Sequence, residues 1–165
     1  DNVRVPVANR LGREGQGFAI AMEGLDGGRI NIATCSIGTA QQALEEAVAY
    51  VQERKQFDTA IADFQATQFK LADMATEVEA ARMLCLKAAW LKDQGQDYDL
   101  ASSMAKLYAS EVAGRASDQA VQIHGGYGYM REYEIERDLR DSIASTIYSG
   151  TSELQHNIIS RFMGL

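Results

Sequence analysis

The scarcity of proline is the feature that most constrains the fold of this chain. Its 165 residues contain one proline, Pro6, so every later segment lacks the strongest helix breaker. After Gly17, apolar residues recur every three or four positions, which is the spacing of one face of an α-helix. We therefore expect an all-α protein, an antiparallel helical bundle, over residues 17–165.

Local signals place the expected helices. The approximate ranges are 30–51, 63–95, 100–123, 134–145 and 151–165. Asp63 is a candidate N-cap of the second helix, and Ser152 and Gln155 have the spacing of a capping box in the last. The adjacent glycines of "LDGGR", residues 25–29, are expected to break the first helical stretch.

The first residues have a different pattern. "DNVRVPVANRLG" alternates valine with other residues at Val3, Val5 and Val7, which is typical of a strand. A single strand is not stable alone, so we expect it to pair with something outside this chain. Residues 1–16 are therefore assigned as a linker or the tail of another domain.

Composition excludes several functions. The net charge of −7 argues against a general surface for nucleic acid or anionic membranes. No stretch is apolar and long enough to span a bilayer, so no membrane span is expected. Cys35 and Cys85 are far apart and lack the spacing of metal ligands, which predicts no metal site and a reducing compartment.

Several polar motifs each allow two interpretations. The glycines of "QIHGGYGYM", residues 122–130, bring the backbone close to a ligand or simply end a helix, with His124 a structural histidine. Arg54 in "ERKQF" either binds a phosphate or complements a helix dipole. "SGTSELQ", residues 149–155, is either an anion site or an ordinary helix start.

Two further motifs have simpler local interpretations. Asp26 and Arg29 form an ion pair or bind a ligand's head group. "GREGQGF" lacks the Lys-Ser/Thr of a P-loop and is read as a turn.

In this order, the motifs resemble the C-terminal helical domain of the acyl-CoA dehydrogenases. The segments that carry the resemblance are "LDGGR", "ERKQF", "IADFQATQFKLADMATEVEAAR", "ASSMAKLYASEV", "AVQIHGGYGYM", "ERDLRD" and "IYSGTSELQ". "DNVRVPVANRLG" looks like the last strand of that family's middle β-domain. The resemblance implies an FAD-dependent homo-oligomer, a dimer or tetramer, that removes the α and β hydrogens of an acyl-CoA. It also implies electron-transferring flavoprotein as partner and a bacterial cytoplasmic or mitochondrial matrix location.

The resemblance also implies roles for particular residues. The FAD contacts would be Arg54, Gln56, Phe57, Gln122, Gly125, Gly126, Thr151 and Glu153. Of these, Arg54, Gln56 and Phe57 would contact the FAD of a neighbouring subunit. Asp26 and Arg29 would hold the CoA end of the substrate, and Gly150 would lie against it.

The chain departs from the family pattern at the base that removes the α proton. Most members have a glutamate before the Gly-Thr of "GTS", where this chain has Ser149. A smaller branch has the base just before the arginine of "LDxxR", where this chain has Gly28. A neutral serine with no activating partner is not a strong base, although the amide of residue 149 would still bind the thioester oxygen. Glu23 lies five residues before Gly28, about 140° around the helix, and is expected to face elsewhere. Asp58, where many members have glycine, is a minor departure.

Three functions remain open from the sequence. The first is an acyl-CoA dehydrogenase with an unusual or borrowed base. The second is a protein that binds FAD and acyl-CoA but performs another reaction, or is the non-catalytic subunit of a heteromer. The third is a bundle that acts only in assembly; the retained Arg54, Gln122, Gly126 and Thr151 argue against it.

Overall fold

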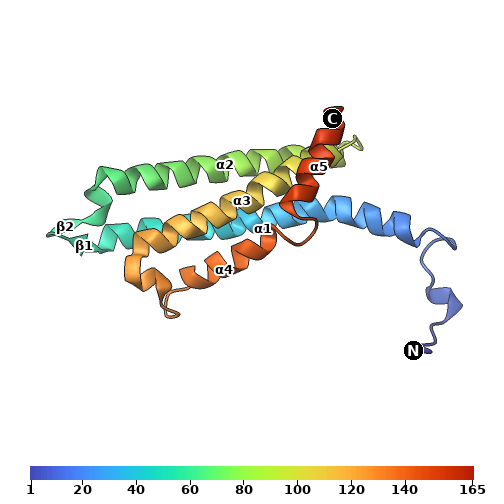
Figure 1. Ribbon diagram of the computed structural model, residues 1–165, viewed down its shortest axis with the longest axis horizontal. Coiled ribbons are helices and arrows are strands. Elements are labelled where there is room, and N and C mark those ends of the chain that lie inside the picture. Colours follow the sequence, from blue (N-terminus) through green and yellow to red (C-terminus); the bar gives the residue numbers. More distant parts are fainter.

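The computed structural model describes all residues, 1–165, and is almost entirely helical (Figure 1). The α-helices are α1 (Gly17–Glu53), α2 (Gln65–Asp93), α3 (Asp99–His124), α4 (Ile135–Ser145) and α5 (Ser152–Phe162). A small antiparallel hairpin joins β1 (Lys55–Gln56) to β2 (Thr59–Ala60). Short 3₁₀ turns cover Val7–Asn9, Ile61–Asp63 and Gly125–Tyr129. The prediction of an all-α bundle is confirmed.

Helix α3 is the centre of the bundle. It packs against both α1 and α2, and it also contacts α4 and α5. The three long helices lie side by side, with the hairpin at one end of the bundle and α5 near the other (Figure 1). The 37 residues of α1 make it about 55 Å long. The hairpin and α5 are therefore far apart in the molecule and are connected mainly by the long helices.

The core between these helices is built largely from alanine. The fully buried alanines on α1 and α3 are Ala33, Ala40, Ala43, Ala47, Ala105, Ala109, Ala113 and Ala120. Because an alanine side chain is a single methyl group, helix axes that meet at alanines approach closely. Val48 of α1 is 36% exposed, whereas Ala43 and Ala47 of the same helix are fully buried.

The expected break at "LDGGR" is wrong, because α1 runs without interruption through Gly27 and Gly28. The cost of a helical glycine, about 1 kcal/mol, is small enough for tertiary packing to outweigh. The side chains of Asp26 and Arg29 also form an ion pair at 2.9 Å across one turn of this helix. Of the two interpretations open for this pair, the ion pair is present, and binding of a ligand's head group stays a prediction.

Two expected caps are also wrong. Asp63 lies in the 3₁₀ turn before α2, which begins at Gln65 without a side-chain cap. The N-cap of α5 is Thr151, whose hydroxyl oxygen accepts a hydrogen bond from the Leu154 amide at 3.3 Å. Ser152 is therefore the first helical residue, and the side chain of Gln155 is turned to other partners.

The N-terminal segment forms no strand within this chain. The side chains of Val3, Val5 and Val7 are highly exposed, and Val7 begins a 3₁₀ turn. The segment leads away from the bundle beyond the start of α1 (Figure 1). Its assignment to another domain, and pairing with a strand outside this chain, remain predictions.

The β1–β2 hairpin was not predicted from the sequence. Its two turn residues, Phe57 and Asp58, both have positive φ, 55° and 61°. A two-residue turn with both φ values positive favours glycine, asparagine or aspartate, so Asp58 suits its position in this turn.

Candidate functional site

The turn before α5 has an unusual backbone. Ser149 and Gly150 are two successive residues with positive φ, 55° and 90°. A Cβ atom on Gly150 would lie 2.7 Å from Nε2 of Gln155 and 3.1 Å from Cδ2 of Leu154. Glycine is therefore required at residue 150 by both its conformation and its surroundings.

Two buried side chains hold this turn by its carbonyl groups. Nζ of Lys106 donates a hydrogen bond to the Gly150 carbonyl oxygen at 2.7 Å. Nε2 of Gln155 donates to the same oxygen at 3.2 Å and to the Ser149 carbonyl oxygen at 3.5 Å. The backbone N–H groups of Ser149, Gly150 and Thr151 donate to no acceptor in this chain. Free amides at a helix N-terminus attract negative charge.

Glu153 lies in the first turn of α5. Its pKa is lowered, first by a hydrogen bond from its own backbone N–H and next by one from the Thr151 hydroxyl. A carboxylate at this end of a helix is also stabilised by the helix dipole. The structure therefore places the predicted residues Thr151 and Glu153 beside the Ser149–Gly150 turn.

Helix α1 brings Gly28 to this turn. A Cβ atom on Gly28 would lie 3.8 Å from Oγ of Ser149, and nothing else would lie within 4 Å of it. The two positions where a catalytic carboxylate was sought in the sequence are thus adjacent in space. Neither carries one.

An open cavity of about 460 Å³ adjoins Gly28. It is lined by Ile20, Glu23, Gly24, Gly27, Gly28, Asn31, Lys92 and Tyr98. Glu23 is expected from helix geometry to face away from Gly28, yet both residues line this open cavity. Three glycines leave this face of α1 without side chains, so the cavity extends around the helix. Glu23 is the only acidic residue that lines it.

Polar groups surround the Asp26–Arg29 pair. Asp99 begins α3 nearby, and its pKa is raised by burial first and then by the negative charge of Asp26. The pKa of Tyr98 is raised for the same two reasons, in the same order. Nζ of Lys92 lies 5.7 Å from the centre of the Tyr98 ring. The predicted CoA contacts Asp26 and Arg29 thus lie in a polar region at the Gly28 end of the bundle.

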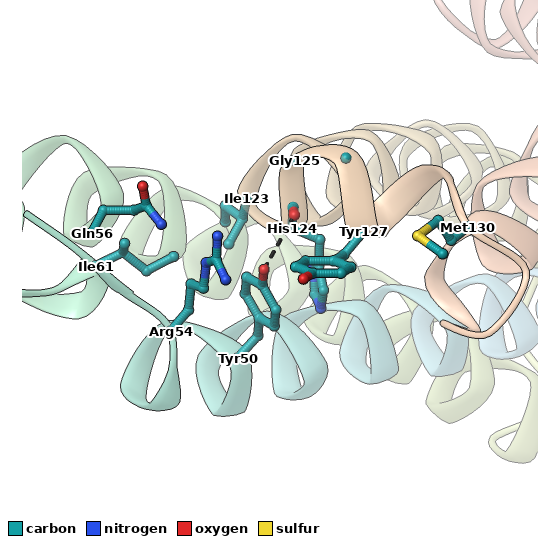
Figure 2. Close-up of a pocket in the computed structure, with 10 residues that line it drawn as sticks. Tyr50, Arg54, Gln56, Ile61, Ile123, His124, Gly125, Tyr127 and Met130 are labelled. Atoms are coloured by element: carbon teal, nitrogen blue, oxygen red, sulfur yellow. Dashed lines mark hydrogen bonds between the residues drawn. The ribbon is translucent and has the colours of Figure 1, made fainter.

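A second cavity, of about 580 Å³, lies at the hairpin end of the bundle (Figure 2). Its lining residues are Tyr50, Arg54, Gln56, Ile61, Ile123, His124, Gly125, Gly126, Tyr127 and Met130. The guanidinium carbon of Arg54 lies 5.4 Å from the centre of the Tyr127 ring. The cavity therefore combines aromatic rings, one cation and a glycine backbone.

His124 has a structural role, as expected. Its side chain is 6% exposed, and its ring stacks on that of Tyr50 with 4.1 Å between centroids. Nδ1 of His124 lies 2.7 Å from the Ala120 carbonyl oxygen, so this nitrogen carries a proton and donates. The Tyr50 hydroxyl donates to the His124 carbonyl oxygen at 3.3 Å, as the dashed line in Figure 2 marks.

The predicted cofactor residues fall into two groups. Arg54, Gln56, Gly125 and Gly126 line the second cavity, whereas Gln122 and Phe57 lie outside its lining. Phe57 is 92% exposed at the tip of the hairpin. Thr151 and Glu153 lie near Lys106, which is 19 residues before Gly125 along α3, or about 28 Å away.

Sequence reasoning missed Lys106, Gln155, Tyr50 and Tyr127. Lys106 is the clearest of these, because it is a charged residue on a face of α3 that otherwise carries small or apolar side chains. Because buried lysines are rare, a lysine on an apolar helix face indicates a candidate functional residue from the sequence alone. The spacing of Ser152 and Gln155 predicts a capping box, but the Gln155 side chain instead bonds the carbonyl groups of the Ser149–Gly150 turn.

Comparison with known proteins identifies the family. Residues 15–164 match the family model described as "Acyl-CoA dehydrogenase, C-terminal domain". The chain belongs to the acyl-CoA dehydrogenase family. It covers the C-terminal domain of that family, as the resemblance of its sequence motifs predicts.

The similar proteins in this family include named dehydrogenases and a reductase subunit. The chain is 54% identical over 161 residues to a probable acyl-CoA dehydrogenase, YngJ, of Bacillus subtilis, covering 98% of this chain and 42% of that protein. It is 52% identical to the caffeyl-CoA reductase–Etf complex subunit CarC of Acetobacterium woodii, covering 97% of this chain and 42% of the relative. The solved butyryl-CoA dehydrogenase of Megasphaera elsdenii superposes with a TM-score of 0.94 at 46% identity, over 98% of this chain and 42% of that one. The chain thus spans less than half the length of these relatives.

Three further findings concern membrane spans, metal ligands and cysteines. None of the helices combines the length and the apolar character needed to cross a membrane. No group of three or more histidine, cysteine, aspartate or glutamate side chains is gathered in a way that would hold a metal ion. Both cysteines are free, with Cys35 exposed and Cys85 buried.

Proposed function

We propose that this chain is the C-terminal domain of an FAD-dependent acyl-CoA oxidoreductase whose usual base position is occupied by Ser149. The family assignment supports the general reaction class, oxidoreduction of acyl-CoA thioesters. One observation carries the proposal: a Cβ on Gly28 would lie 3.8 Å from Oγ of Ser149, beside a turn whose amides donate to no acceptor in this chain. The site therefore keeps the groups for holding a thioester and lacks the carboxylate.

The residues present fit FAD. A flat heterocycle suits the aromatic wall of the second cavity, and Arg54 and the backbone at Gly125 and Gly126 suit phosphate groups. A Cβ at Gly125 or Gly126 would meet nothing within 4 Å, so the backbone there is open to a ligand. FAD supplies the acceptor for the substrate's β hydride when it is bound.

The two groups of predicted FAD contacts lie near Lys106 and Gly125, positions about 28 Å apart along α3. We assign them to two different FAD molecules, one contacted by each end of the domain. Gln56, Phe57 and Gln122 would then complete the hairpin end, and Thr151 and Glu153 the α5 end. This arrangement requires a homo-oligomer, a dimer or tetramer, in which each FAD lies between subunits.

The Ser149–Gly150 turn would hold the thioester. The free amides of residues 149–151 are placed to donate to the thioester oxygen and to stabilise the charge that develops on it. Asp26 and Arg29 would bind the CoA portion. Gly150 must be glycine for the backbone to take this shape, so its role is to place the amides.

Dehydrogenation also needs a group that accepts the α proton as the β hydride leaves. The Ser149 hydroxyl is neutral, and Lys106 is directed to the Gly150 carbonyl, which leaves the serine without an activating base. We therefore propose that this proton is taken by a carboxylate from outside the two usual positions. The alternative is that the protein binds FAD and acyl-CoA without dehydrogenating, as a redirected enzyme or the non-catalytic subunit of a heteromer.

The experiment uses the full-length protein that contains this chain, loaded with FAD and kept free of oxygen. Acyl-CoAs of different chain length are added while the visible absorbance of the flavin is followed. Rapid bleaching with one of them supports a dehydrogenase with a borrowed base, and loss of bleaching in a Glu23→Gln variant would identify Glu23 as that base. A spectral shift without bleaching supports the alternative. No response to any acyl-CoA contradicts both.

The partner proposed for the dehydrogenase is an electron-transferring flavoprotein. The name of the similar CarC protein places that protein in a complex with Etf, which supports the proposal by similarity. The free thiols of Cys35 and Cys85 fit a reducing compartment, and we propose the bacterial cytoplasm or the mitochondrial matrix.

A further inference from the structure

We propose that Lys106 is a positioning residue of the thioester site. In this role its buried ammonium group, together with Gln155, holds the Ser149–Gly150 turn so that its amides face the substrate. The inference rests on the proposed function, because it assigns a task to a residue behind the same turn. Lys106 does not touch the substrate itself.

The burial of Lys106 needs an explanation. Its side chain is 0% exposed on α3, yet it makes a single hydrogen bond, to the Gly150 carbonyl oxygen. Burial lowers the pKa of its ammonium, while the negative charges of Glu111 and Glu153 act in the opposite direction. An apolar side chain such as methionine would fill the same space without removing a charge from water. The lysine therefore points to a function for its one contact.

Gln155 supports the same carbonyl from α5. Its side chain is also 0% exposed, and its amide nitrogen shares the Gly150 oxygen with Lys106. The Gln155 side-chain oxygen is buried without a partner. Burial of the Lys106 charge and of the unpaired Gln155 oxygen costs free energy. In return, the two side chains connect the turn to α3 and α5.

The hydrogen bonds to the carbonyl oxygens also fix the direction of the N–H groups in the same peptide units. In a planar trans peptide, C=O and N–H point in opposite directions. Drawing the Gly150 oxygen inward turns the Thr151 N–H outward, and drawing the Ser149 oxygen inward does the same for the Gly150 N–H. Ser149 has a positive φ, which few non-glycine residues adopt, so the turn needs such support to keep its shape.

The ammonium charge adds to this effect. A cation on the carbonyl side of a peptide group polarises it and makes its N–H a better donor, most strongly where water is excluded. The amides would then stabilise an enolate oxygen more than a neutral carbonyl oxygen. Lys106 is therefore expected to change how acidic the bound substrate is, more than how tightly it binds.

The test compares Lys106→Met with the wild type in the FAD-loaded full-length protein. The probe is acetoacetyl-CoA, whose enolate absorbs light and whose α proton is acidic enough to titrate when bound. We expect Lys106→Met to lower the ratio of enolate to neutral bound probe about tenfold, since it weakens the oxyanion donors. Lys106→Arg, which keeps the charge and the donors, should recover part of the ratio. The matched control is Lys87→Met, which removes an exposed lysine of α2.

The outcomes separate the inference from the proposed function. If wild type fails to bind acetoacetyl-CoA, the proposed function is wrong and this inference with it. If wild type and Lys106→Met bind it with the same enolate ratio, only the inference is overturned, and Lys106 is structural. FAD content and the thermal midpoint report folding of each variant. If Lys106→Met does not fold, Gln155→Met decides instead: the inference requires a smaller decrease of the ratio in the same direction.

Discussion

Gly28 on α1 and Ser149 before α5 are 121 residues apart in sequence, yet a Cβ on Gly28 would lie 3.8 Å from Oγ of Ser149. A glutamate at either residue would place its carboxylate in the same small region, from opposite sides. The two base positions considered from the sequence are therefore two ways of supplying one site. Restoring a carboxylate at either position tests whether the rest of the site is intact.

Ser149→Glu is expected to increase dehydrogenase activity of the FAD-loaded full-length protein. A positioned general base contributes about 10² to 10⁴ in rate, so the gain in kcat should fall in that range, with little change in KM. Steady-state assays with an artificial electron acceptor measure it. Asn157→Glu, on an exposed part of α5, is the control for added negative charge. Unchanged kcat in a flavin-loaded variant that binds acyl-CoA would mean that proton abstraction is not the missing step.

Gly28→Glu is expected to increase the same activity from the other side. The new side chain enters open space next to Ser149, and replacing a helical glycine favours the helix by about 0.7 kcal/mol. Gly38→Glu is the control, because Gly38 is an exposed glycine ten residues further along the same helix and its Cβ would meet nothing within 4 Å. We expect the kcat of Gly38→Glu to remain that of wild type. Equal gains in both variants would show that the position of the carboxylate is unimportant.

The long helices were readable from the sequence because they depend on repeated local spacing. The ranges expected for α2, α3 and α4 agree with the structure to within two residues at each end. The continuous α1 was not predicted, because a pair of glycines was read as a local break and tertiary packing outweighed that preference. The hairpin at Phe57 and Asp58 was missed because neither turn residue is glycine.

Only those residues of the candidate site that lie in a recognisable sequence motif could be predicted. Asp26, Arg29, Arg54 and Gly125 were proposed from quoted motifs. Arg54 and Gly125 line the cavity at the hairpin end, and the Asp26–Arg29 ion pair lies near Tyr98, which lines the cavity beside Gly28. The pairing of Lys106 with Gly150 joins α3 to the turn before α5, and no spacing along the chain reveals such a contact. Nor did the sequence show that Glu23 and Gly28 line one cavity, since that depends on the width left by neighbouring glycines.

Gly150→Ala is expected to destabilise the protein by about 1–3 kcal/mol. The residue has a φ of 90°, and its new Cβ would lie 2.7 Å from Nε2 of Gln155, so both backbone strain and overpacking contribute. Chemical denaturation of the full-length protein measures the free energy of unfolding. Gly114→Ala on α3 is the control, because it is helical and its Cβ would meet nothing within 4 Å, which predicts a slight gain. A Gly150→Ala variant as stable as wild type would show that the turn adapts easily.

Asp99→Asn is expected to stabilise the protein near neutral pH. Burial, followed by the charges of Asp26 and Asp97, raises the pKa of Asp99 in the folded state, so its ionised form is less favourable there than in the unfolded chain. The folded state then holds more protons than the unfolded state between the ordinary aspartate pKa, about 3.9, and the raised value. Across that window, this group's contribution to stability falls as pH rises, and the penalty is complete above the raised pKa.

Removing the ionisable group should remove this trend. The free energy of unfolding of Asp99→Asn minus that of wild type should therefore be small at low pH and grow to a constant positive value towards neutral pH. Denaturation curves at several pH values measure the difference, with Asp141→Asn on exposed α4 as the control for loss of one negative charge. A difference that does not depend on pH would assign the effect to packing or hydrogen bonding. A negative difference near neutral pH would show that the Asp99 carboxylate is favourable at the start of α3, through Arg29 and the helix dipole.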